Sequence, residues 1–264
     1  MSFVSVIYIY HDCFAVKTED AVLIFDFWKD PYQKGPLPNP LQNVDPDTPI
    51  YVFVSHSHKD HYNPEIFSWA EHFKNIHYIV SKDVRKRINH ILNPDSIYSG
   101  PKIKDDQLTV LHHDDHYSDD IIEVRSFPST DIGNSYAVNI AGRNIFHAGD
   151  LNAWIWKDES TQQEINKALG DFNVILNKIA QHYNRFDICF FPVDSRIGTD
   201  YFTGAAIFLR RFKIDNFLPM HYELADDPES VAGRHRDAAA FALYASPTCR
   251  HYLLSAPYSV YTLY

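Results

Sequence analysis

The stretch SHSHKDH, residues 55–61, carries four side chains that can bind a metal ion. They follow the pattern H-x-H-x-D-H and are His56, His58, Asp60 and His61. Imidazole nitrogen and carboxylate oxygen are ligands that suit zinc and its neighbours in the first transition row. The stretch follows PIYVFV, residues 49–54, a β-branched and aromatic run that predicts a buried strand. We therefore expect a rigid strand to present four ligands in one tight loop.

Composition limits the classes to which the chain can belong. With 264 residues, 45% of them hydrophobic, it can bury a substantial core, and we expect one domain over residues 1–264. The formal net charge of -10 argues against broad nucleic-acid binding, which needs clustered Lys and Arg. The first residues show no basic n-region, and no apolar run approaches roughly 18 residues. We therefore predict neither a signal peptide nor a membrane span.

The cysteines indicate a reducing compartment. Cys13, Cys189 and Cys249 are odd in number, far apart and without metal-motif spacing. We interpret them as reduced thiols, which predicts a cytoplasmic protein. An aromatic content of 15% allows a subunit interface, but nothing in the sequence locates one.

Hydrophobic periodicity predicts strands early, helices between later strands, and strands again at the end. Besides strand 49–54, the expected strands are 4–10, 14–17, 22–25, 76–80, 108–111, 121–127, 135–140, 144–147, 188–191, 214–218, 252–254 and 259–263. The expected helices are 64–73, 83–91, 160–183, 204–212 and 231–244. This order predicts an α+β protein with two sheets and helices outside them.

Three later segments place a potential ligand just past the end of an expected strand. Asp131 follows strand 121–127, Asp150 follows strand 144–147, and His221 follows strand 214–218. Ligands at the carboxyl ends of strands can converge on one edge of a sandwich.

A second polar run, residues 112–116, reads HHDDH. It lies between the expected strands 108–111 and 121–127, and we interpret it as an exposed, solvated hairpin loop rather than a metal site.

With these motifs the chain resembles the metallo-β-lactamase-fold superfamily of metal-dependent hydrolases over nearly its whole length. Its appearance is nearest to the branch that includes the L-ascorbate-6-phosphate lactonases. The resemblance implies a four-layer αββα sandwich with a site for one or two divalent metal ions between loops at the sheet edges. It implies zinc first, with manganese or iron as alternatives.

The resemblance also implies ligand roles. His56 and His58 would hold the first ion, Asp150 would bridge both ions, and the second ion would be held by Asp60, His61 and His221.

One position departs from the family pattern, which usually offers a histidine four residues before a serine that begins the next strand. Here that spacing joins Asp131 to Ser135, so the ligand would be Asp131. A carboxylate would make the first site harder and less positive. Whether Asp131 binds the ion or points elsewhere stays open, and so does the number of ions.

Several polar residues near the motifs are expected to support the site. By the resemblance, His11, Asp26 and Asp194 would orient the ligands through hydrogen bonds. Lys59, Arg196 and Tyr222 are the candidates nearest in sequence for holding an anionic group, and Trp154 is a candidate wall of a substrate pocket.

The function that these expectations favour is metal-dependent hydrolysis. A metal-bound hydroxide would attack an ester, lactone or phosphoester bond of a small molecule, with Asp60 and Asp150 as catalytic carboxylates. One alternative is a phosphodiesterase or nuclease of the same fold. The other is a non-catalytic metal- or ligand-binding protein, which the altered ligand at Asp131 motivates.

Overall fold

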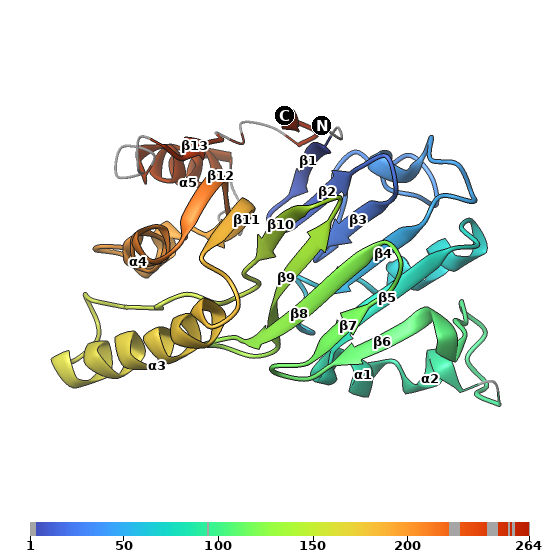
Figure 1. The fold of residues 1–264 in the computed structure, drawn as a ribbon, viewed down its shortest axis with the longest axis horizontal. Coiled ribbons are helices and arrows are strands. Elements are labelled where there is room, and N and C mark those ends of the chain that lie inside the picture. Colours follow the sequence, from blue (N-terminus) through green and yellow to red (C-terminus); the bar gives the residue numbers. More distant parts are fainter. Residues whose placement is uncertain are drawn as a thin grey trace. The chain divides into compact units, whose positions relative to one another are not determined.

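The fold contains two seven-stranded β-sheets, and helices follow the later strands (Figure 1). The computed structural model describes residues 4–93, 95–221, 228–241, 248–252, 254 and 257–263. The chain divides into a first unit, residues 1–112, 117–121 and 256–264, and a second unit, residues 113–116 and 122–255. The expectation of a single domain stays a prediction.

The first sheet has the strand order β14-β1-β2-β3-β4-β5-β6. Its strands are β1 (Val4–Tyr10), β2 (Cys13–Lys17), β3 (Val22–Phe25), β4 (Ile50–Val54), β5 (Ile76–Ser81), β6 (Leu108–Leu111) and β14 (Val260–Leu263). Strands β3 to β6 are parallel, whereas β2 is antiparallel to both β1 and β3. As a result β1, β3 and β4 all end at the same edge of this sheet.

The second sheet has the order β13-β12-β11-β10-β9-β8-β7. Its strands are β7 (His116–Ser118), β8 (Ile122–Pro128), β9 (Asn134–Ile140), β10 (Arg143–His147), β11 (Arg185–Pro192), β12 (Lys213–Met220) and β13 (Arg250–His251). Strands β10, β11 and β12 are parallel, and β9 is antiparallel to β8 and β10. Strands β8, β10, β11 and β12 therefore end at one edge.

The helices are short in the first unit and longer in the second. The first unit has η1 (Asn39–Leu41), η2 (Pro64–Glu71), α1 (Lys82–Arg87), α2 (Asn89–Leu92) and η3 (Asp105–Gln107). The second has α3 (Gln162–Ala180), η4 (Ser195–Ile197), α4 (Thr203–Arg211) and α5 (Pro228–Phe241). No helix within the described ranges is both long and apolar enough to span a membrane.

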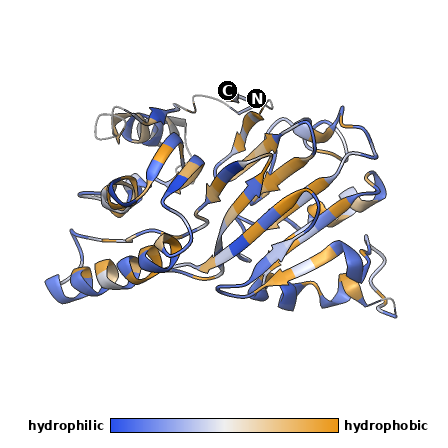
Figure 2. Ribbon diagram, viewed as in Figure 1, coloured by the Kyte–Doolittle hydropathy of each residue, from blue (hydrophilic) through white to orange (hydrophobic). Residues whose placement is uncertain are grey.

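Each unit has its own apolar core, and Figure 2 shows the strands mostly in the hydrophobic colour. In the first unit Trp69 of η2 is fully buried and meets Phe27 edge to face at 4.9 Å between ring centroids. In the second unit Phe208 of α4 packs against Phe146 and Phe191 at 5.0 and 4.7 Å. These aromatic contacts fix the helices to the sheets that carry the polar loops.

The helix expected over 64–73 is present as the 3-10 helix η2 and ends at Glu71, and the carbonyl of its Ile66 accepts a hydrogen bond from the Tyr78 hydroxyl at 2.8 Å. One helix prediction is wrong in detail. The helix expected over 83–91 is divided at Ile88, whose ψ of 13° interrupts the helix while its side chain is fully buried.

The last expected strands differ as well. The prediction of a strand over residues 252–254 is wrong, because Arg250 and His251 form the strand that pairs with β12. Helix 231–244 begins earlier, at Pro228, and its last three expected residues lie outside the described residues.

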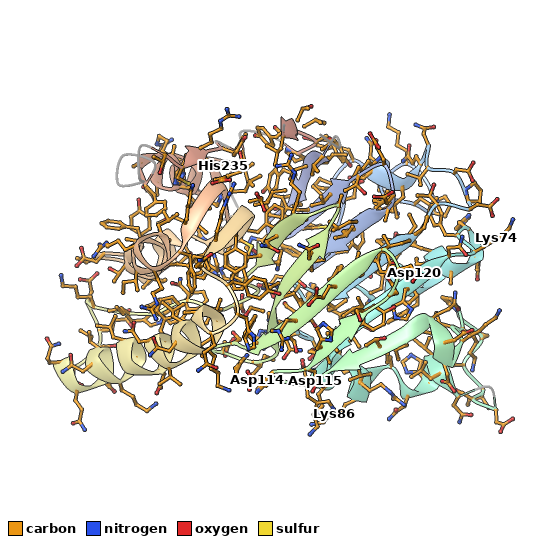
Figure 3. The ribbon with its side chains drawn as sticks, viewed as in Figure 1. Lys74, Lys86, Asp114, Asp115, Asp120 and His235 are labelled. Carbon is orange, nitrogen blue, oxygen red and sulfur yellow. The ribbon has the colours of Figure 1, made fainter. Side chains whose placement is uncertain are left out.

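The polar run at residues 112–116 is not a hairpin loop, so that prediction is wrong. Strand β6 belongs to the first sheet and β7 and β8 to the second, so the run connects two sheets. His116 lies on β7, with its Nε2 3.1 Å from a Glu123 carboxylate oxygen, and Asp114 forms an ion pair with Lys178. Figure 3 labels Asp114 and Asp115 in this connection.

The free energy of unfolding is expected to fall at acidic pH because of His251. Its ring packs against Phe217 and Phe241, at 4.7 and 5.3 Å between centroids, and neither ring nitrogen has a hydrogen-bond partner among the described residues. Burial lowers the pKa of this imidazole from 6.5 to about 4. Because the unfolded chain then binds more protons, stability decreases as pH falls from about 6.5 to about 4.

Urea denaturation at pH 7 and pH 5 measures this dependence. We expect His251→Leu to remove about 1–2 kcal/mol of the loss at acidic pH. Replacing the exposed His72 by leucine should leave the pH dependence unchanged. An identical pH dependence in His251→Leu and wild type would contradict the assignment.

Candidate metal centre

In the first unit, three polar segments leave the same edge of the sheet. Strands β3 and β4 are parallel, with Phe25 opposite Phe53, so Asp26 and the SHSHKDH loop begin side by side. The two residues between β1 and β2 are His11 and Asp12, and they lie at this edge because β1 runs in the same direction as β3. Sheet topology thus brings together residues that are far apart in sequence.

Asp26 is the centre of a hydrogen-bond network in this unit. Its Oδ1 accepts from the Ser55 backbone N at 2.7 Å, and its Oδ2 accepts from the Ser55 hydroxyl at 2.5 Å. The same Oδ2 lies 2.8 Å from Nδ1 of His61, and the Ser55 hydroxyl oxygen lies 3.0 Å from Nδ1 of His56. One buried carboxylate therefore sets the orientation of two imidazole rings.

The histidines of the motif cluster around His56. Its ring centroid is 4.5 Å from that of His58 and 4.1 Å from that of His61. His56 and His61 are fully buried, whereas His58 is exposed and Asp60 partly exposed. Since Nδ1 of His61 is held by Asp26, an ion would be bound through Nε2, which lies 3.1 Å from Oδ2 of Asp12.

In the second unit the expected ligands also meet at one sheet edge. Asp150, Asp194 and His221 follow the parallel strands β10, β11 and β12. Asp131 follows β8, and one of its carboxylate oxygens lies within 4.8 Å of one of Asp150. Asp131 itself is exposed, and its backbone N donates to the Ser129 hydroxyl at 3.2 Å.

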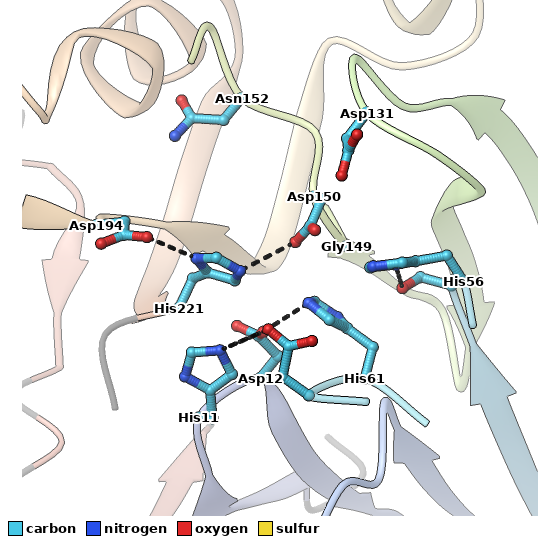
Figure 4. Close-up of polar contacts among 12 residues, drawn as sticks. His11, Asp12, His56, His61, Asp131, Gly149, Asp150, Asn152, Asp194 and His221 are labelled. Carbon is cyan, nitrogen blue, oxygen red and sulfur yellow. Dashed lines mark hydrogen bonds and ion pairs between the residues drawn. The ribbon is translucent and has the colours of Figure 1, made fainter. Parts of the chain in front are cut away.

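His221 connects two carboxylates (Figure 4). Its Nδ1 lies 2.9 Å from Oδ2 of Asp194, and its Nε2 lies 3.3 Å from Oδ1 of Asp150. Burial opposes ionisation of Asp194, but hydrogen bonds from His221 and Arg196 hold the pKa of this carboxyl well below its usual value. Asp194 is therefore a fixed negative charge behind the imidazole.

Three residues were predicted as candidates for binding an anionic group of the substrate, and the structure bears on two of them. Arg196 donates through Nε to both carboxylate oxygens of Asp194 at 2.9 Å, so its guanidinium is already paired with that carboxylate. Lys59 is exposed on the motif loop. Tyr222 lies outside the described residues.

Four residues that make these contacts were not predicted from the sequence to support the ligands, although Trp154 was predicted as a wall of a substrate pocket. Asp12 lies 3.1 Å from Nε2 of His61, and Ser55 joins Asp26 to His56. Trp154 donates its indole N–H to the Asp150 carbonyl at 2.8 Å, and Asn152 anchors the same loop to Thr130. Only Asp12 left a signal in the sequence, as a His-Asp pair between two apolar strands.

Several of these residues have strained backbone angles. His11, Asp26, Trp154 and His221 adopt positive φ angles of 56°, 43°, 46° and 68°. Such angles are uncommon for residues other than glycine and cost about 1–3 kcal/mol each. Strained residues persist where the surrounding structure fixes them, and they concentrate at functional sites.

The donors fit a first-row divalent ion. The buried donors are imidazoles and carboxylates, and the three cysteines are free thiols. Burial raises the pKa of the Cys13 thiol well above its usual value. A nitrogen and oxygen donor set of this kind suits zinc, iron or manganese.

Comparison with known families identifies the chain. Residues 22–222 match the family model described as the beta-lactamase superfamily domain. The chain belongs to this family. Its match spans the SHSHKDH loop, Asp150 and His221, and it confirms the predicted α+β metallo-β-lactamase fold. A search of curated protein sequences gave no match.

Solved structures of low sequence identity share this fold. Igni18, described as a metallo hydrolase from Ignicoccus hospitalis, is 15% identical, with a TM-score of 0.62 and 99% of each chain covered. YhfI from Bacillus subtilis is 9% identical, with a TM-score of 0.58 and coverage of 99% of this chain and 100% of that one. CmlA, a diiron β-hydroxylase from Streptomyces venezuelae, is 13% identical with a TM-score of 0.62, and the match covers 99% of this chain and 54% of CmlA.

Proposed function

We propose that this member of the beta-lactamase superfamily is a metal-dependent hydrolase that cleaves an ester, lactone or phosphoester bond of a small molecule. We propose further that the chain binds one or two divalent ions. The proposed ligands are His56, His58, Asp60, His61, Asp131, Asp150 and His221.

One repeated arrangement carries the proposal. In the first unit Asp26 holds Nδ1 of His61, and in the second unit Asp194 holds Nδ1 of His221. In both cases a buried carboxylate orients a buried imidazole and leaves its Nε2 for a ligand. This carboxylate–histidine pairing is the usual support of metal-binding histidines, because it fixes the tautomer and raises the basicity of the ring.

The remaining residues would hold substrate and protons. A bound divalent ion supplies polarisation of the scissile group and a lowered pKa for attacking water. Asp60 is partly exposed at the end of the motif, where its carboxylate can orient water or accept a proton. Asp150 lies against His221, and Trp154 fixes its loop from the other side by a bond to the Asp150 carbonyl.

We propose zinc as the first choice of ion, since the donor set contains nitrogen and oxygen. Iron is the second choice, supported by the fold shared with the diiron protein CmlA. A sugar-phosphate lactone is the most specific substrate that the resemblance to lactonases suggests. Because Arg196 is paired with Asp194, residues other than Arg196 would have to bind the phosphate of such a substrate.

Elemental analysis of protein purified without chelator tests the centre. We expect close to two transition-metal ions per chain in wild type and one in Asp131→Ala, because Asp131 is near the Asp150 carboxylate. One ion in both proteins would place Asp131 outside the centre. No transition metal after reconstitution would overturn the proposed function.

Turnover separates a hydrolase from a binding protein. We expect wild type to hydrolyse a generic aryl ester, lactone or aryl phosphodiester, and His58→Ala to reduce turnover about 100-fold or more. His72→Ala is the matched control, since His72 is also exposed but lies at the end of η2. Metal-loaded protein without turnover on any of these compounds would favour a non-catalytic role, and activity confined to oligonucleotides would favour a nuclease.

A further inference from the structure

We propose that His11 and Asp12 are metal ligands, so that the first unit binds a divalent ion through His11, Asp12 and His61. This inference rests on the proposed function, because His61 belongs to both ligand sets. It adds a carboxylate and an imidazole from the β1–β2 turn to the donors that the SHSHKDH loop provides.

The turn that carries these residues is unusual for a connection between two strands. Tyr10 pairs with Cys13, so His11 and Asp12 alone join β1 to β2. Two-residue turns of this kind usually contain asparagine, aspartate or glycine at positive φ, and they are normally exposed. Here the histidine has a φ of 56°, and both side chains are fully buried. A strained, buried His-Asp pair is costly, which indicates a role for the side chains themselves.

The distances converge on one point. Oδ2 of Asp12 lies 3.1 Å from Nε2 of His11 and 3.1 Å from Nε2 of His61. Donors bound to one ion at about 2.0–2.2 Å stand about 2.8–3.1 Å apart at octahedral angles and about 3.3–3.6 Å apart at tetrahedral angles. Oδ2 of Asp60, 3.8 Å from Nε2 of His11, is close enough to complete the set.

The orientation of the rings agrees with this assignment. Nδ1 of His61 is engaged by Asp26, so the nitrogen that faces Asp12 is the one available to an ion. The Tyr8 hydroxyl accepts a hydrogen bond from the His11 backbone N at 3.0 Å and fixes the turn. Both imidazoles therefore have Nε2 near the same carboxylate oxygen, His61 with its ring held by Asp26 and His11 with its backbone held by Tyr8.

Charge favours a cation at this point. A buried carboxylate is costly unless a positive charge compensates it. A divalent ion at this point would provide such a charge. Two histidines with one or two carboxylates form a set typical of iron(II), zinc and manganese sites.

The test uses Co²⁺, whose visible and near-ultraviolet spectrum reports its ligands. In Asp12→Cys we expect Co²⁺ to produce an intense sulfur-to-cobalt charge-transfer band in the near ultraviolet that wild type lacks. In Asp12→Asn we expect at least about tenfold weaker Co²⁺ binding by chelator competition. The two variants test coordination directly and by affinity, so misfolding of one leaves the other decisive.

Asp30 provides the matched control. It is also a buried carboxylate of the first unit, but it accepts from the backbone N of Tyr32 and Asn39 at 2.9 and 2.8 Å. Asp30→Cys should show no charge-transfer band, and Asp30→Asn should bind Co²⁺ as wild type does.

Two results would overturn the inference, and only one of them would also overturn the proposed metal centre. Wild type that binds Co²⁺, together with no band in Asp12→Cys and unchanged affinity in Asp12→Asn, rejects the ligand role of Asp12 alone. Wild type that binds no Co²⁺ rejects this inference and the proposed metal centre together.

Discussion

Replacing Asp26 by asparagine is expected to weaken metal binding at His61 and to reduce turnover. Asparagine fits the positive φ of 43° at this position, so the backbone can stay in place. Its amide oxygen can still accept from the Ser55 backbone N, which places the NH2 group where Oδ2 faces Nδ1 of His61. Nδ1 must then accept the hydrogen bond, so Nε2 carries the proton and cannot bind an ion.

We expect Asp26→Asn to lower metal affinity about 10–100-fold and stability by about 1–3 kcal/mol. Chelator competition gives the affinity, and urea denaturation gives the free energy of unfolding. Asp30→Asn is the control, because it removes a buried carboxylate of the same unit that touches no histidine. Unchanged affinity in Asp26→Asn would mean that the bond between Asp26 and His61 does not support an ion.

Gly204→Ala is expected to displace the loop that carries Asp150. Gly204 lies in the first turn of α4, where an added Cβ would stand 1.8 Å from Oδ1 of Asn152 and 2.8 Å from the backbone N of Ala153. Asn152 is buried, and its Oδ1 accepts from the Ala153 backbone N at 2.8 Å, so neither atom can simply move aside. The close approach of helix and loop therefore requires glycine.

We expect Gly204→Ala to lower the free energy of unfolding by about 1–3 kcal/mol. If Asp150 moves by about 1 Å, the turnover rate should fall about 100-fold. Denaturation and steady-state kinetics measure the two effects. Gly170→Ala, in the middle of α3, is the matched control because an added Cβ there meets nothing within 4 Å. That change should stabilise the protein by about 0.5–1 kcal/mol through helix propensity. Comparable behaviour of the two variants would refute the steric argument.

The sequence by itself determined the candidate ligands and most of the strands. Strand β4 and the motif after it are local features, since a β-branched run followed by closely spaced histidines needs no distant residue to be recognised. The same holds for Asp150 and His221, each placed just past a strand end. Resemblance to a family then supplied the fold, and the match over residues 22–222 confirmed it.

Only the tertiary structure decided which residues support those ligands. Asp26 and Ser55 are joined through parallel pairing of β3 with β4, and Asp12 reaches His61 because β1 ends at that same edge. The connection at residues 112–116 was predicted as a hairpin because its composition is that of a turn. Sheet membership, turn strain and close approach at Gly204 depend on long-range pairing, which local periodicity and residue spacing do not encode.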